Sequence, residues 1–243
     1  MTEHLALVSA CFGGIDDIKP FPRVDGVDTF LFLDEPARKA ADPAALATWG
    51  QVIVPDYPRH DFSPRLRSKY FKLQIHRLPE LESYRWLGWA DTSLLFHDAA
   101  FMPAIVEWLA AQKSSQRIAL LPHPERQTVR EEYEFVRAQI AAGHQGLRLR
   151  YVNEKMDEQM RYFFDRGWNL DAPLWASGFW IIENSSQIAW CWDAWWHQNL
   201  RYGMMCQLSL PVMLAQFGLE PRPVHLNIYH NEFFEWIMHP RLM

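Results

Sequence analysis

The chain has 243 residues, of which 49% are hydrophobic and 22% charged, and its formal net charge is −5. This size fits one large α/β domain or two small ones, with enough apolar residues for a sizeable core. The slightly acidic balance argues against a general nucleic-acid-binding protein, which is usually basic. The three cysteines form no CxxC pair, which argues against a disulfide framework or a zinc knuckle and favours a reducing, cytoplasmic environment.

Apolar runs bounded by turn residues predict strands, in chain order, at 4–14, 27–35, 51–58, 84–91, 117–123, 174–184 and 222–230. Helix-type patterns alternate with them, at 37–50 (helix and loop), 63–81, 101–112, 128–143, 153–167, 185–200 and 206–218, and 231–243 is expected to be a short tail. Strands that alternate with helices predict an α/β domain with a mostly parallel central sheet flanked by helices. No stretch reaches the roughly 20 apolar residues of a membrane-spanning helix, so no transmembrane segment is expected.

Several polar residues follow the predicted strands, at the edge where open α/β sheets bind ligands. Gly13 and Asp34 end the first two strands, and Asp91 ends the strand at 84–91. The oxygen atoms of Asp91 and of Ser93 are suited to a hard divalent cation, Mn²⁺ or Mg²⁺, that bridges the phosphates of a nucleotide. The alternative is that Asp91 only caps a turn or the next helix.

The helix predicted from Ser63 carries a basic face, because Arg65, Lys69 and Lys72 are spaced three and four residues apart. Such a face is suited to neutralising a diphosphate. The alternative is an ordinary solvated helix face.

Two late segments add polar candidates. Gln207 lies in an otherwise apolar helix pattern, where the alternative is an ordinary helix cap. His225 and His230 are candidates for a metal ligand or a phosphate contact, and the alternative is a structural role.

Twelve tryptophans are present, and four of them cluster between residues 190 and 196. Helical geometry places Trp192, Trp195 and Trp196 on one face and Trp190 elsewhere. Core packing is the preferred interpretation. The alternatives are a sugar-stacking platform or an aromatic edge that touches a membrane surface.

Taken in order along the chain, these stretches resemble a family of GT-A-like glycosyltransferases filed as domain of unknown function 616. The resemblance covers nearly the whole chain and is carried by six segments, at residues 12–20, 27–35, 65–93, 120–136, 175–196 and 206–218. The segment at 65–93 is similar to the family's hallmark, a lysine-bearing helix followed by a strand that ends in the pattern WxDxS. The segment at 120–136 resembles its HPxR motif with a downstream glutamate.

The resemblance implies a Rossmann-like GT-A domain over residues 1–243, with a nucleotide-sugar-binding half at 1–125 and an acceptor-side half at 126–243. It implies transfer of a sugar from a nucleotide-diphosphate donor, with UDP as the default nucleotide, to a glycan or polysaccharide-precursor acceptor. Asp91 would be the aspartate of the metal-binding element, and Lys69 and Lys72 would contact the donor. Gln207 would lie near the reacting sugar carbon, which favours retention of configuration.

An inverting enzyme would instead need a base, for which Glu183 and Asp193 are candidates.

Two departures from the family pattern stand out. Cys206, preceded by Met205, stands where the family shows an aspartate preceded by an arginine. The segment that begins at Asp91 carries one acid where many GT-A enzymes have two, so a metal there would also use Ser93 and His230.

Three hypotheses follow. The first is a metal-assisted glycosyltransferase in the cytoplasm, with peripheral contact to the inner membrane face through the apolar segment 233–238. The second is a nucleotide-sugar-binding protein that has lost catalysis, for which the substitution at Cys206 is the main argument. The third is an α/β interaction protein whose tryptophans form a partner surface.

Overall fold

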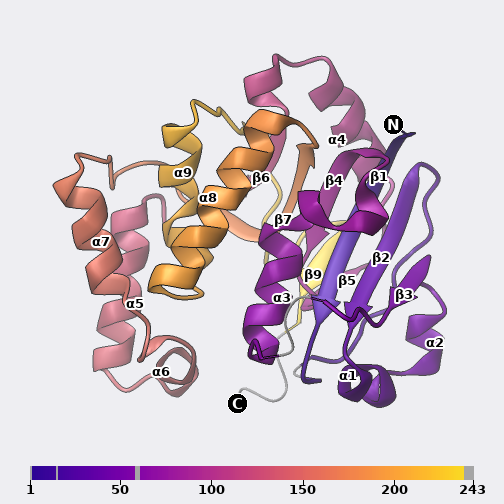
Figure 1. The fold of residues 1–243 in the computed structure, drawn as a ribbon, viewed down its shortest axis with the longest axis horizontal. Helices are drawn as coiled ribbons and strands as arrows, with labels where there is room; N and C mark the ends of the chain where they lie inside the picture. Colours follow the sequence, from indigo (N-terminus) through magenta and orange to yellow (C-terminus); the bar gives the residue numbers. More distant parts are fainter. Residues whose placement is uncertain (1, 15, 58–60, 238–243) are drawn as a thin grey trace.

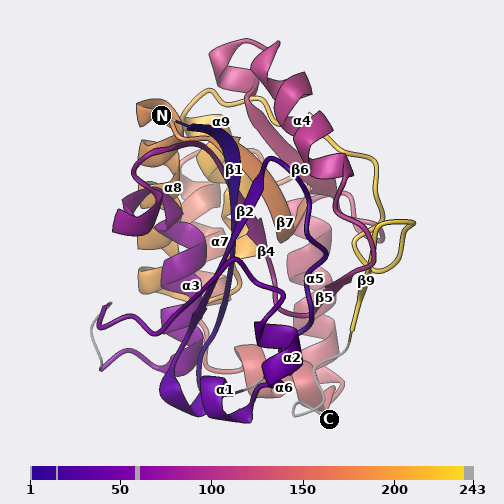
Figure 2. The ribbon, with the colours of Figure 1, turned by 90° about the vertical axis from the view of Figure 1, so that its right-hand side faces the viewer.

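The computed structural model describes residues 2–14, 16–57 and 61–237. Its centre is a seven-stranded sheet in the order β3-β2-β1-β4-β7-β6-β8, with helices on both faces (Figures 1 and 2). The strands are β1 (Thr2–Cys11), β2 (Val27–Leu33), β3 (Gln51–Ile53), β4 (Tyr84–Ala90), β5 (Leu94–Phe96), β6 (Ile118–Pro122), β7 (Trp175–Glu183), β8 (Arg222–Pro223) and β9 (Phe234–Trp236). The helices are α1 (Glu35–Ala40), α2 (Pro43–Leu46), α3 (Pro64–Leu73), α4 (Phe101–Ala110), α5 (Val129–Ala141), α6 (Gln145–Tyr151), α7 (Met156–Asp165), α8 (Ser186–Tyr202) and α9 (Leu210–Gln216).

The sheet is mostly parallel, as predicted. Strands β3, β2, β1 and β4 are parallel neighbours, and β6 pairs in parallel with β8. Strand β7 alone runs the other way, since it is antiparallel to both β4 and β6. The carboxyl ends of β1, β4 and β6 therefore share one edge of the sheet with the amino end of β7.

Two apolar clusters pack against the two faces of the sheet. Helices α3, α8 and α9 cover one face and α4 covers the other (Figure 2). Trp192, Trp195 and Trp196 are buried in the first cluster, whereas Trp190 is 62% exposed. The predicted division of this tryptophan group is therefore confirmed, and the three buried rings are core residues.

The C-terminal part of the chain differs from the prediction. The strand expected at 222–230 is reduced to Arg222–Pro223, because the chain turns directly afterwards, where the N–H of Leu226 donates to the carbonyl of Val224 at 2.8 Å. Part of the expected tail instead forms β9, which pairs with β5 directly after the Asp91 turn. Both strands have three residues, too few to show an alternating pattern.

The segment proposed for membrane contact, 233–238, is buried at Phe234 and only partly buried at the other residues that the structure describes. Phe234 is fully buried and Phe233 stacks on Phe101 with ring centroids 4.5 Å apart, while residue 238 lies outside the described residues. In the part of the chain that the structure covers, no helix has both the length and the apolar character needed to cross a bilayer.

Phe71 links α3 to the sheet, because its fully buried ring stacks on Phe32 and Phe12 at 4.5 and 5.2 Å. We expect Phe71→Ala to lower the free energy of unfolding by about 3–5 kcal/mol, through lost burial and a cavity. The matched control is Phe164→Ala on α7, where the ring is 69% exposed and the change should stay within about 0.5 kcal/mol. Urea unfolding measures both, and equal losses in the two variants would contradict this packing.

Candidate functional site

A cavity of about 470 Å³ opens at the edge where β1, β4 and β6 end. Phe12, Asp91 and His123, which follow these strands, line it together with Ser177 near the start of β7. Helix α3, the segment between α8 and α9, and residues near the C-terminus complete the wall. The reversed direction of β7 thus brings residue 177 to the same edge as residue 91.

An ion pair joins α3 to the end of β4. The Nζ atom of Lys72 lies 3.0 Å from Oδ1 of Asp91, and the indole Nε1 of Trp89 donates to the same oxygen at 2.6 Å. Lys72 is 1% exposed, whereas the side chain of Asp91 is 40% exposed and opens onto the cavity. Gly178 makes room for this carboxylate, since a Cβ at that position would lie 3.2 Å from Oδ2.

Each charge of this pair shifts the pKa of the other group. Burial alone would raise the pKa of Asp91, but the ammonium groups of Lys72 and Lys69 outweigh it, so the pKa lies below its ordinary value. Burial lowers the pKa of Lys72, and the carboxylate of Asp91 opposes this shift. The pair therefore places a fixed negative and a fixed positive group on one wall of the cavity.

Lys69 lies one turn earlier on α3 and faces a thiol. Its Nζ is 3.1 Å from the Sγ atom of Cys206, which is also 3.5 Å from Oγ of Ser177. Burial alone would raise the pKa of Cys206, but the ammonium groups of Lys69 and Lys72 outweigh it and lower the pKa. Trp195 anchors this turn, because its Nε1 donates to the carbonyl of Cys206 at 2.8 Å.

A second cluster of polar side chains lines the cavity beside α5 and the loop after β6. The Nε2 atom of Gln207 donates to Oε1 of Glu132 at 2.9 Å, and Glu132 forms an ion pair with Arg126. Burial is the main cause that raises the pKa of Glu132, although Arg126 opposes it. All three side chains line the cavity.

His123 belongs to the same wall and is held as a hydrogen-bond acceptor. Its Nδ1 accepts from the backbone N–H groups of Glu125 and Arg126 at 3.2 and 3.1 Å. Burial, supported by the positive charge of Arg126, lowers the pKa of His123 to about 4. The ring is therefore neutral at physiological pH.

The structure brings together six of the residues expected from the sequence, which line one cavity: Arg65, Lys69, Lys72, Asp91, Ser93 and Gln207. Gly13 and Asp34 are absent from its lining. Instead, the N–H of Gly13 donates to Oδ2 of Asp34 at 2.7 Å, and Asp34 caps α1 by accepting from Ala37. Their local role is to fix the turn after β1 and the start of α1.

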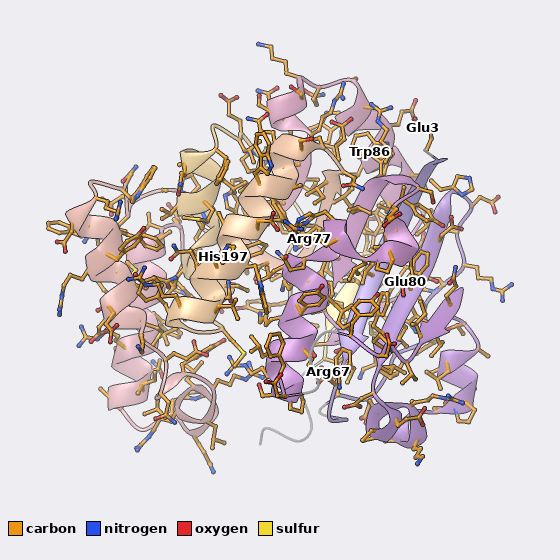
Figure 3. All side chains as sticks on the ribbon, in the orientation of Figure 1. Glu3, Arg67, Arg77, Glu80, Trp86 and His197 are labelled. Carbon is orange, nitrogen blue, oxygen red and sulfur yellow. The ribbon has the colours of Figure 1, made fainter. Side chains whose placement is uncertain are left out.

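The expected bases lie elsewhere. Glu183 is the last residue of the antiparallel β7, so it lies at the opposite edge of the sheet, between Arg117 at 2.7 Å and Arg85 at 3.0 Å. Asp193 on α8 pairs with Arg77, which Figure 3 shows at the junction of α3 and α8. Neither carboxylate lines the cavity.

The residues present do not fit a divalent cation. Among residues 2–14, 16–57 and 61–237, no three His, Cys, Asp or Glu side chains are grouped as a metal site. Oδ1 of Asp91 already accepts from an ammonium and an indole, and a second ammonium lies on the same wall. His230, the expected second ligand, pairs with Glu235 through an isolated backbone β-bridge, and its side chain does not line the cavity.

Several residues that line the cavity had no predicted site role, notably Asp16, Ser177 and Glu132. The hydroxyl of Thr92 donates to Oδ2 of Asp16 at 2.6 Å, which ties the loop after β1 to the Asp91 turn. Ser177 gives no local signal because it lies inside an apolar strand. The glutamate downstream of the HPxR motif was a signal that could have identified Glu132.

Comparisons with known proteins support the fold. No protein-family model and no curated protein matches the chain, so membership of the family suggested by its motifs stays a prediction. The solved structures include the apo form of the bifunctional glycosyltransferase WbbM, which matches with a TM-score of 0.51 and 10% identity over 92% of this chain and 39% of that one. The apo form of mouse xyloside xylosyltransferase 1 matches with a TM-score of 0.49 and 10% identity, over 91% and 85% of the two chains. The chain thus has a GT-A-like glycosyltransferase fold, although it spans well under half of WbbM.

The ionisation of His123 predicts a pH dependence of stability. Its pKa is about 4 when folded and ordinarily 6.5, so the folded protein binds fewer protons between these values. The contribution of His123 is therefore complete above pH 6.5 and is lost as the pH falls towards 4. We expect His123→Gln to reduce the loss of unfolding free energy across this window by about 1 kcal/mol, a value discounted for partial exposure. Urea unfolding at a series of pH values measures this, and identical slopes for both proteins would contradict it.

Proposed function

We propose that the chain is a glycosyltransferase that moves a sugar from a nucleotide-diphosphate sugar to a hydroxyl of a glycan or polysaccharide-precursor acceptor. The observation that carries this proposal is the pairing of Lys69 and Lys72 with Asp91 and Cys206 in one cavity of a GT-A-like fold. The cavity of about 470 Å³ is within the usual range for ligand pockets, roughly 300–1,000 Å³. UDP is the default nucleotide.

The charges in the cavity suit the chemistry. Transfer breaks the bond between the anomeric carbon and the diphosphate, so positive charge develops on the sugar and negative charge on the leaving phosphate. Fixed ammonium groups at this position stabilise the leaving group more in the transition state than in the ground state. The two lysines of α3 would supply this effect.

The second polar wall suits the sugar. Glu132 accepts from Nε2 of Gln207 and so orients its side-chain amide, which leaves Oε1 to face the positive charge that develops on the sugar. Among the residues that the structure describes, three carboxylates line the cavity, and each accepts from a donor: Asp16 from Thr92, Asp91 from Lys72 and Glu132 from Gln207. By the resemblance, Gln207 would lie near the reacting sugar carbon, and its place in the cavity lining supports a retaining reaction.

The three cysteines are free thiols, which supports placing the activity in a reducing cytoplasm.

A second candidate function is binding of a nucleotide sugar without transfer. The specific observation in its favour is Cys206, which stands where the resembling family shows an aspartate. Donor binding without any product would support this candidate over the enzyme.

A screen of the purified chain tests the proposal. Thermal unfolding would be followed with UDP, GDP and CMP and their common sugar conjugates, because a ligand of the folded state raises the midpoint. Donors that bind would then be incubated with oligosaccharide acceptors and analysed by mass spectrometry. If no nucleotide or nucleotide sugar raises the midpoint, the proposal fails.

Substitutions in and outside the cavity should separate catalysis from stability. We expect Asp91→Asn to lower kcat/KM by about a hundredfold or more, because it removes the charge that holds Lys72 in place. Glu183→Gln should leave kcat/KM unchanged but lower the free energy of unfolding by about 1–3 kcal/mol, since Arg85 and Arg117 lose a charged partner. Steady-state kinetics and urea unfolding measure the two effects, and a large loss of activity in Glu183→Gln would restore that residue as a candidate base.

A further inference from the structure

We propose that this chain holds the diphosphate of its donor with the ammonium groups of Lys69 and Lys72 in place of a divalent cation, and that Cys206 permits this by leaving Lys69 available to the phosphates. The inference rests on the proposed function and specifies how its donor is bound. It concerns one wall of the cavity, formed by α3, the Asp91 turn and the turn at Cys206.

The carboxylate of Asp91 already has a charged partner. In a metal-dependent site this carboxylate would coordinate the cation. Here Oδ1 accepts from Lys72 at 3.0 Å and from Trp89 at 2.6 Å, so an ammonium occupies the side of the carboxylate that faces α3. A divalent cation bound beside Asp91 would also be repelled by the like charges of both lysines.

Lys69 has a thiol as its partner, that of Cys206, at 3.1 Å. An aspartate at position 206, as in the resembling family, would stay ionised at neutral pH and hold the ammonium in a salt bridge. A thiol can be neutral, and a thiolate can become neutral by taking up one proton when a diphosphate approaches. The ammonium then remains charged without a fixed anionic partner.

Neighbouring side chains hold Cys206 in position. Its Sγ lies 3.5 Å from Oγ of Ser177, and its carbonyl accepts from Trp195 at 2.8 Å and from Ser209 at 3.2 Å. Cys206 is 3% exposed. The thiol therefore stays in position, with a hydroxyl neighbour, when Lys69 turns towards a phosphate.

The local pairing of the two lysines also favours a diphosphate. Lys72 is paired with Asp91, whereas Lys69 faces the thiol of Cys206, and a neutral thiol leaves the positive charge of Lys69 uncompensated by that partner. Lysine is a common phosphate ligand because its ammonium acts as a mobile point charge with three donors. The same two residues would therefore supply binding and leaving-group stabilisation.

Isothermal titration calorimetry of the full chain tests the inference, with UDP, GDP and inorganic pyrophosphate as probes. Each titration is done in EDTA and again in MnCl₂. The variants are Lys69→Met, Cys206→Asp and Cys206→Ser, and the matched control is Lys39→Met on the exposed side of α1. Far-UV circular dichroism and the thermal midpoint establish that each variant is folded.

For the unaltered chain we expect a dissociation constant for the nucleotide that agrees within about twofold between EDTA and MnCl₂. Lys69→Met and Cys206→Asp should each weaken binding in EDTA by about tenfold or more, which corresponds to about 1.4 kcal/mol. Lys39→Met should stay within about threefold of the unaltered chain, and Cys206→Ser, which adds no negative charge, should bind more tightly than Cys206→Asp. If Cys206→Asp does not fold, the EDTA comparison and Lys69→Met still decide.

The contrary results distinguish a failure of metal-free diphosphate binding from a failure of the donor site itself. Nucleotide binding that is lost in EDTA and restored by MnCl₂ would overturn this inference and leave the proposed function intact. Unchanged binding by folded Cys206→Asp would overturn the role given to Cys206. Failure of every probe to bind in both buffers would overturn the donor site, and the inference with it.

Discussion

The ion pair between Lys72 and Asp91 is the interaction on which the site depends. It joins the last turn of α3 to the end of β4, and the ammonium is almost completely removed from water. A buried ammonium is costly unless a charged partner and good geometry compensate, and Asp91 meets both needs at 3.0 Å. Because Asp91 also opens onto the cavity, the same pair holds the helix in place and sets the charge of the site.

The reversed strand β7 has a comparable influence on the geometry. In an all-parallel sheet, the edge beyond β4 would be built by loops that follow strands. Here the first residues of β7 lie beside the Asp91 turn, and the backbone N–H of Asp91 donates to the carbonyl of Gly178 at 2.8 Å. One strand thus brings Ser177 to Cys206 and sends Glu183, at its other end, to a structural role between two arginines.

The cavity has two walls of different character. The wall formed by α3 carries two ammonium groups, of which Lys72 is paired with Asp91 and Lys69 faces the thiol of Cys206. On the opposite wall, Glu132 is paired with Arg126 and orients Gln207. This asymmetry suits a ligand that has an anionic end and a polar, uncharged end. A nucleotide-diphosphate sugar has this division between its phosphates and its sugar.

Local sequence signals were sufficient for much of the fold and for the α3 wall. Ser63 and Pro64 start a helix whose spacing places Lys69 and Lys72 near one another, and Asp91 follows a long apolar strand. These are short-range properties, since capping and helical periodicity involve only neighbours within four residues. The alternation of strands and helices likewise determined the α/β class.

Tertiary structure decided which polar residues share the cavity. Glu183 and Gly13 follow or end strands as Asp91 does, but β7 runs backwards and Gly13 is engaged by Asp34, so neither enters the site. Cys206 lies 137 positions from Lys69 along the chain, and only the packing of the turn before α9 against α3 brings them within 3.1 Å. Residue types and local periodicity belong to the sequence, whereas strand direction and long-range contact are set by how the whole chain buries its apolar faces.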